Sequence, residues 1–294
     1  MDPFTALFDA IDTINAHIDR ALDDLETDLD IPEETEIPQS PDRVQDVGVT
    51  QDFNALKSQL NELAALGWAD EEASWSSNFQ LQVSAFNAIA SPSQTIDRLL
   101  SHARKSTPKF KVPQMTPRTI VESTPFAAGL FEVDEEGWVT IKVSPDFWDD
   151  RSAAQAILAH EVCHYLLENA GIRYADVAIN ERYTDLCMFI CGFGPLFLAG
   201  YKRDFAQQDD RPGHRLGYLS DEEYQYADRY VVELRQVYQL KLQSELEIQK
   251  RRLRERLQGN DVTLNRLIEY ERRRSPYKSE IELYQDAIDR LERG

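Results

Sequence analysis

Two histidines four residues apart, His160 and His164, are the clearest chemical feature of this sequence, and Glu161 directly follows the first of them. Residues i and i+4 share one face of an α-helix, so both imidazoles can bind the same metal ion. Glu161 lies one step round the helix, where its carboxylate can take a proton from a zinc-activated water without being a ligand. The spacing predicts a zinc (Zn2+) site with Glu161 as a neighbouring general base.

A catalytic zinc ion needs a third protein ligand and an open fourth position. Glu181 follows His164 by 17 residues, which is enough chain to turn at Gly171 and bring a second helix alongside the first. Asp185 lies four residues further on and shares a helix face with Glu181. We therefore expect Glu181 to bind the metal, and Asp185 to accept a hydrogen bond from the far nitrogen of a ligating histidine.

The two motifs together resemble those of the thermolysin-type gluzincin zinc peptidases. The match consists of His-Glu-x-x-His at 160–164 and of Asn180, Glu181, Thr184 and Asp185, within about 35 of the 294 residues. The resemblance implies a compact zincin-like catalytic core in which Glu181 completes the zinc site and Asp185 orients the first histidine. The region also looks like a group of uncharacterised bacterial H-E-x-x-H proteins.

Gluzincins usually have a His or Tyr that stabilises the oxyanion of the tetrahedral intermediate, so the resemblance implies one more catalytic residue. The candidates are His214 and Tyr218, and Tyr183 is a weaker third. A role for His214 as an ordinary surface residue is an equal alternative.

The chain has three cysteines, Cys163, Cys187 and Cys191. An odd number close to the predicted site helices is not a disulfide framework, and it favours a reducing compartment. Cys187 and Cys191 have i, i+4 spacing and could bind metal, but we expect no further ligand near them. We interpret all three as buried free thiols.

Charge and hydropathy restrict the class of protein. The net charge of −20 repels phosphate backbones and argues against general nucleic-acid binding. The N-terminal Met-Asp-Pro-Phe is acidic where a signal peptide would be basic, and no stretch of about 18 apolar residues occurs. We expect a cytoplasmic protein without a membrane span.

The first 50 residues hold 14 acidic and 2 basic residues, which is more than half of the net charge. This composition is typical of a solvated, flexible linker. The alternative is a removable acidic segment that docks on the basic tail or shields the site, so that the enzyme is latent until a partner or stress signal releases it.

The chemical residues must be positioned by helices and by a small sheet. We expect the motif helix at 153–169, with Asp149, Asp150 or Ser152 as N-cap and Gly171 as C-terminal stop, and a second helix at 177–191. Further helices are expected at 5–26 and 50–66, and one or two more within 79–104, divided by Ser91-Pro92-Ser93. Near the end of this stretch, His102 is interpreted as a surface or capping residue. Residues 108–125 contain four prolines and are expected to be loop.

Residues 130–133 and 138–143 alternate in polarity around the turn 134–137, which predicts a β-hairpin before the motif helix. Its edge could bind an extended peptide by adding it to the sheet. A purely structural hairpin is at least as good an interpretation.

From Ser220 a capping box and a helical apolar pattern predict a long helix that folds back as a helical hairpin. Residues 241–294 contain 13 basic and 11 acidic residues, a mixture typical of a solvated coiled-coil face. We expect this tail to pack or to self-associate, with binding to a protein partner or nucleic acid as the alternative.

The fold class that follows is mainly α, as α+β, with three domains. These are an acidic N-terminal helix and linker (1–48), a zinc metallopeptidase core (49–219) and a helical tail (220–294). The function expected is zinc-dependent intracellular hydrolysis of peptide bonds, as an endopeptidase. The alternative is a zinc-stabilised, inactive interaction module that presents the tail to a protein partner.

Overall fold

A computed structural model describes residues 53–68, 79–86, 91–123, 128–148, 150–203 and 214–293. The expected helix at 5–26 and the acidic segment within 1–48 lie outside these residues, as does the N-cap candidate Asp149. No helix in the described part of the chain is both long and apolar enough to cross a membrane.

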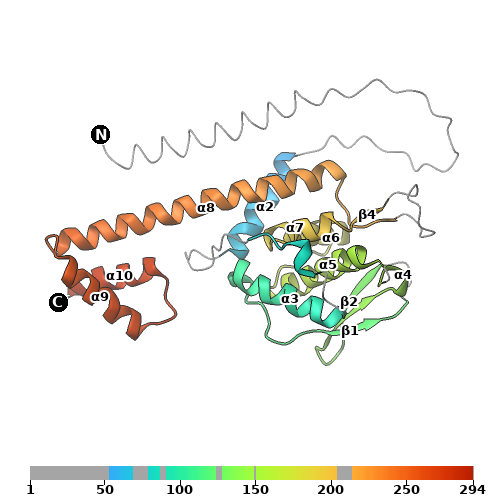
Figure 1. Cartoon of the computed structure of the whole chain (residues 1–294), viewed down its shortest axis with the longest axis horizontal. Helices are drawn as coiled ribbons and strands as arrows, with labels where there is room; N and C mark the ends of the chain where they lie inside the picture. The colour runs from blue at the N-terminus through green and yellow to red at the C-terminus, as the bar shows by residue number, and fades with distance from the viewer. Residues whose placement is uncertain are drawn as a thin grey trace, which may run out of the picture. The chain divides into compact units, whose positions relative to one another are not determined.

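The structure is mainly helical with two small sheets, as expected for an α+β protein (Figure 1). In chain order its elements, where η marks a short 3-10 helix, are α2 (Phe53–Gly67), η2 (Val83–Phe86), α3 (Pro92–Ser106), η3 (Pro108–Phe110), β1 (Arg118–Val121), β2 (Gly129–Val133), β3 (Val139–Val143), α4 (Pro145–Trp148), α5 (Arg151–Asn169), α6 (Val177–Ile190), α7 (Gly194–Leu198), β4 (Lys202–Arg203), β5 (His214–Arg215), α8 (Asp221–Arg256), α9 (Asp261–Arg274) and α10 (Glu280–Arg293).

The predicted hairpin is present as β2 and β3, which pair antiparallel from Gly129–Val143 to Val133–Val139. The Asp134 side chain accepts hydrogen bonds from the backbone N–H groups of Glu136 and Trp138 and so holds the turn. The loop expected at 108–125 is partly wrong, because β1 pairs parallel with β3. The sheet order is β1-β3-β2, which places β2 at an edge.

Helix α5 is the centre of the core, and it packs against α3, α6, α7 and the sheet (Figure 1). From Ala153 to Leu167 every residue of α5 is buried except His160 and His164, which are partly exposed. A helix that is apolar on nearly all sides must be enclosed by its neighbours. The two histidines therefore lie where the neighbouring elements leave α5 accessible to solvent.

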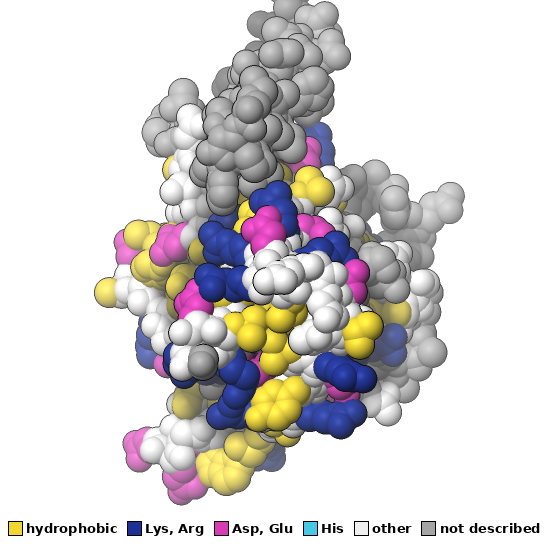
Figure 2. Space-filling view, turned by 90° about the vertical axis from the view of Figure 1, so that its left-hand side faces the viewer, with side chains coloured by type: hydrophobic (Ala, Val, Ile, Leu, Met, Phe, Trp, Pro, Cys, Tyr) yellow, Lys and Arg dark blue, Asp and Glu magenta, His cyan; other side chains and the backbone are white. Residues whose placement is uncertain are grey.

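The C-terminal helical hairpin is present. Helix α8 begins with the predicted capping box of Ser220 and Glu223 and packs on α2, α6 and α7. Its far end packs with α9 and α10 around a separate apolar cluster: Leu246, Leu253, Leu264, Ile268, Tyr284, Ala287 and Ile288. Figure 2 faces the end where α9 and α10 lie and shows hydrophobic side chains interspersed with charged ones.

Candidate metal centre

Helix α5 is fixed at both ends by local interactions. The Asp150 side chain caps the N-terminus by accepting a hydrogen bond from the N–H of Ala153 (3.3 Å). At the C-terminus, Gly171 has a φ of +72°. Its N–H bonds the carbonyl of Glu168 and the N–H of Ile172 bonds that of Leu167, which is a Schellman motif. The chain turns here, as predicted, and leads into α6.

Helix α6 starts and stops by the same means. The Asp176 side chain caps it by accepting from the N–H of Ile179 (3.0 Å). Gly192, with a φ of +80°, ends it, and the N–H of Phe193 bonds the carbonyl of Met188 (2.8 Å). Because α6 packs against α5, its first turns bring Glu181 to the two histidines.

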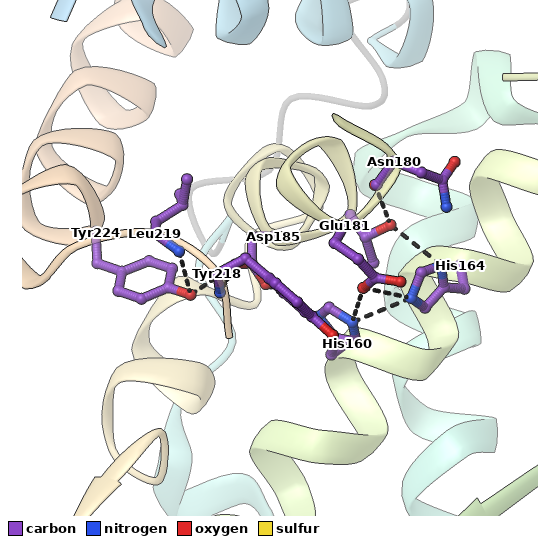
Figure 3. A network of polar contacts seen from close by, with 9 residues as sticks. His160, His164, Asn180, Glu181, Asp185, Tyr218, Leu219 and Tyr224 are labelled. Atoms are coloured by element: carbon purple, nitrogen blue, oxygen red, sulfur yellow. Dashed lines mark hydrogen bonds and ion pairs between the residues drawn. The ribbon is translucent and has the colours of Figure 1, made fainter. Parts of the chain in front are cut away.

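Three side-chain atoms meet between these helices (Figure 3). Glu181 Oε2 lies 3.1 Å from His160 Nε2 and 3.2 Å from His164 Nε2, and the two nitrogens are 3.1 Å apart. Tetrahedral zinc with bonds of about 2.0–2.1 Å separates neighbouring ligand atoms by about 3.3–3.4 Å. The observed triangle is within about 0.3 Å of that size, so this group can hold a metal ion.

The opposite nitrogen of each imidazole faces an acceptor. His160 Nδ1 donates to Asp185 Oδ1 (3.0 Å). The Thr184 hydroxyl donates to the carbonyl of Asn180 (2.9 Å), so its lone pair accepts from His164 Nδ1 (3.2 Å). With the Nδ1–H fixed in both rings, each Nε2 is directed at the common point, as a metal ligand requires.

Asp185 is fully buried, and both of its oxygens are used. Besides His160, it accepts hydrogen bonds from the N–H of Tyr218 (2.6 Å) and the hydroxyl of Tyr224 (2.6 Å), both at Oδ2 (Figure 3). The chain reaches it through Gly217, where a Cβ would lie 1.9 Å from the Tyr224 hydroxyl and φ is +83°. A buried carboxylate with three donors is a rigid support for His160.

The charges of the group favour ion binding. Burial lowers the pKa of His160, but the hydrogen bonds to Asp185 and Glu181 outweigh burial and raise the pKa to about 10. Burial raises the pKa of Glu181, whereas its hydrogen bonds to His160 and His164 lower the pKa to about 2. Without metal, a proton is therefore held between His160 and the two carboxylates, and a cation can replace it.

Glu161 lies next to this group but is not part of it. Its side chain is buried, and burial raises its pKa. The first residue of β2 approaches it closely: a Cβ on Gly129 would lie 2.6 Å from Glu161 Oε1 and 2.4 Å from Ile157 Cγ2. Gly129 thus lets the strand edge pass directly over the carboxylate.

A groove crosses the site. Two hollows of about 580 and 560 Å³ share Gly129, His160, Glu161 and Tyr218 as lining residues, so they join at the candidate centre. The edge strand β2 lines one hollow, and Ser144, Asp146 and Phe147 line the other. The groove therefore extends to both sides of Glu161.

The structure brings Tyr218 to the site, while His214 and Tyr183 point elsewhere. The Tyr218 ring stacks on His160 at 6.1 Å between centroids and is 63% exposed. His214 Nε2 bonds the carbonyl of Gly200 (3.0 Å), and His214 lines neither hollow. Tyr183 donates to Glu62 on α2 (2.6 Å). The Asn180 side chain accepts from the N–H of Tyr174 (3.3 Å) and not from a histidine.

Sequence reasoning missed three supporting residues, namely Gly129, Thr184 as a hydrogen-bond acceptor, and Tyr224. A glycine at the start of a strand is a signal of close backbone approach, so Gly129 could have been recognised. Tyr224 is 39 residues from its partner Asp185 and carries no local signal.

Comparisons with family models, with curated proteins and with solved structures found no match to this chain.

Proposed function

We propose that the protein is a zinc-dependent endopeptidase. The observation that carries the proposal is the convergence of His160 Nε2, His164 Nε2 and Glu181 Oε2 within 3.2 Å of one another, with Glu161 buried beside them in an open groove. Two imidazoles and one carboxylate are a ligand set of hydrolytic zinc sites.

Zinc, when bound, supplies a Lewis acid that makes a water molecule more acidic and polarises a carbonyl group. Glu161 takes the proton of that water as general base and passes it to the leaving amine. Burial has raised the pKa of Glu161, which makes it a better base for a proton that it must later return.

Tyr218 is the candidate for the oxyanion. Burial and the nearby carboxylates of Glu181, Asp185 and Glu161 raise its pKa, so the phenol keeps its proton at neutral pH and can donate a hydrogen bond. Its backbone N–H is fixed by Asp185, which positions the residue beside His160. His214 has no comparable position.

The groove favours an extended peptide as substrate. It continues on both sides of Glu161, so chain on either side of a scissile bond can be accommodated, as cleavage within a polypeptide requires. The outer edge of β2, which pairs with no other described strand, offers backbone groups for such a chain.

Glu161→Gln tests the mechanism. The amide keeps the size of the side chain and leaves the three ligands intact, so zinc content stays at the wild-type value. Proteolysis falls by about 10²-fold or more, because the general base is lost. The assay is digestion of a broad peptide library with and without chelator, with metal measured in the same samples. Glu245→Gln, at an exposed position on α8 that lines neither hollow, is the matched control. Cleavage by Glu161→Gln at the wild-type rate would disprove the role of Glu161.

Glu181→Ala tests the ligand set. Removal of Oε2 leaves two imidazoles, so we expect the zinc content after dialysis to fall well below one equivalent at this site. Elemental analysis measures it. An unchanged stoichiometry would remove Glu181 from the centre.

The competing function is an interaction module, favoured by the separate apolar cluster formed by α8, α9 and α10. Metal analysis does not distinguish the two functions, since both bind zinc. Library digestion does: chelator-sensitive cleavage supports the peptidase, and no cleavage of any peptide by the zinc-loaded full chain supports the module.

A further inference from the structure

The three cysteines come together inside the protein. Cys163 lies on α5, Cys187 lies on α6, and Cys191 is the residue that ends α6; all three are fully buried. Their sulfur atoms all lie within 4.8 Å of one another. The expectation that no third ligand stands near Cys187 and Cys191 was wrong, because the packing of α5 on α6 adds Cys163.

One ion can reach all three sulfurs after small movements. Cys187 Sγ and Cys191 Sγ are 3.8 Å apart. Tetrahedral zinc with Zn–S bonds of about 2.3 Å separates two sulfur ligands by about 3.8 Å. Three points within 4.8 Å of one another share a centre that is at most about 2.8 Å from each. Each sulfur therefore has to move by about 0.5 Å or less to reach bonding distance.

His102 on α3 lies near Cys191, but its ring nitrogens do not lie within 4.8 Å of all three sulfurs. Its Nε2 is shielded from solvent and has no hydrogen-bond partner among the described residues, although the carbonyls of Phe79 and Cys191 lie close to the ring. It lies 3.1 Å from the point that a Cβ on Gly192 would occupy. Buried polar atoms nearly always have a hydrogen-bond partner or bind an ion. This nitrogen is therefore a candidate ligand.

We propose that Cys163, Cys187 and Cys191 bind a thiophilic closed-shell ion, Zn2+ or Cu+, at a second, structural metal site. Thiolates select these ions over harder cations. Structural sites are closed to solvent, as these three side chains are. Zn2+ needs a fourth ligand, for which the His102 ring must move toward the thiols, whereas Cu+ is satisfied by the three thiolates. The C-terminal end of α6 carries partial negative charge and favours a cation there.

Such an ion would join the helices that build the first centre. Cys163 is adjacent to His164 on α5, and Cys187 lies two residues after Asp185 on α6. The end of α3 is already attached at this place, since Ser106 donates to the carbonyl of Cys191 (3.0 Å). An ion at the thiols therefore fixes the spacing between α5 and α6, on which the separation of His164 and Glu181 depends.

The test separates the two sites in the full chain. His160→Gln/His164→Gln removes the first site and leaves the thiols, and Cys187→Ala/Cys191→Ala does the reverse. Zinc and copper are counted per chain by elemental analysis of protein purified under reducing conditions, and X-ray absorption at the metal edge identifies the ligand atoms. Circular dichroism checks the fold of each variant.

We expect two ions per wild-type chain and one in His160→Gln/His164→Gln, with sulfur neighbours at about 2.3 Å. Cys187→Ala/Cys191→Ala keeps one ion with nitrogen and oxygen neighbours alone. His102→Ala lowers zinc retention at least tenfold if the ion is Zn2+ and leaves copper retention unchanged if it is Cu+. If the cysteine variant does not fold, the X-ray absorption spectrum of His160→Gln/His164→Gln still shows whether sulfur atoms bind the remaining ion.

Two results would overturn the proposal. One is a His160→Gln/His164→Gln protein that is folded and metal-free, with three thiols that react after denaturation; the cysteines are then packed side chains. The other is a chain mass lower by the two hydrogens of a disulfide, with one reactive thiol. Neither result bears on the proposed peptidase activity.

Discussion

Asp185→Asn should weaken metal binding without touching a metal ligand. In the wild-type chain Oδ2 accepts from two donors, the N–H of Tyr218 and the hydroxyl of Tyr224, while Oδ1 accepts from His160 Nδ1. An amide has one oxygen and one NH2 group. The oxygen is favoured at the position with two donors, so the NH2 group faces His160. The imidazole must then accept at Nδ1 and carry its proton on Nε2, where the metal should bind.

The magnitude follows from this tautomer change. Loss of an orienting partner of a metal-bound histidine lowers metal affinity about 10- to 100-fold, which is about 1.4–2.7 kcal/mol. Stability falls as well, by about 1–1.5 kcal/mol, because the hydrogen bond from His160 to a charged, fully buried acceptor is replaced by one between neutral groups.

Zinc affinity is measured by competition with a chromophoric chelator, and stability by urea unfolding of the metal-free chain. Tyr224→Phe is the matched control, because it removes one donor to the same carboxylate and leaves the bond to His160. We expect it to cost about 1–2 kcal/mol of stability and to change zinc affinity by less than about threefold. The reasoning is refuted if folded Asp185→Asn binds zinc as tightly as the wild type, or if Tyr224→Phe weakens binding as much.

Two further predictions concern Glu161. Gly129→Ala places a Cβ 2.6 Å from Glu161 Oε1, so the carboxylate must move. Proteolysis should then fall about tenfold or more while zinc content is unchanged. Turnover at the wild-type rate would contradict this. In the metal-free chain, burial raises the folded-state pKa of Glu161, so the protonated form is favoured on folding and this stabilisation is lost as pH rises through that pKa. Glu161→Gln should therefore stabilise the metal-free chain at pH 8 and make no difference near pH 3. Urea unfolding at both pH values measures the free energy of unfolding of the two proteins. Equal stability at pH 8 would argue against the raised pKa.

Local patterns in the sequence determined the elements and the face of each helix. The spacing of His160 and His164 places both rings on one side of α5, because the helical period is fixed by the backbone. Gly171 ends that helix through its left-handed conformation, which a side chain disfavours. The hairpin and the capping box at Ser220 are likewise interactions between residues close in the sequence. Such features depend little on the rest of the chain.

Tertiary packing decided what surrounds these elements. Strand β1 forms because β3 offers it an edge, although the prolines around it predicted a loop. Tyr218 reaches the centre and His214 does not, since the position of each depends on how the chain before α8 folds back onto Asp185. No periodicity within one element could reveal either result.

The contacts among the cysteines and those between Asp185 and its donors could not be predicted from the sequence either. Cys163 meets Cys187 because α5 packs on α6, and Tyr224 meets Asp185 because α8 packs on α6. Contacts of this kind link residues 24 to 39 positions apart, and their geometry depends on the side-chain volumes between the helices. The sequence by itself determined which residues can do chemistry here, and only the tertiary structure decided which of them meet.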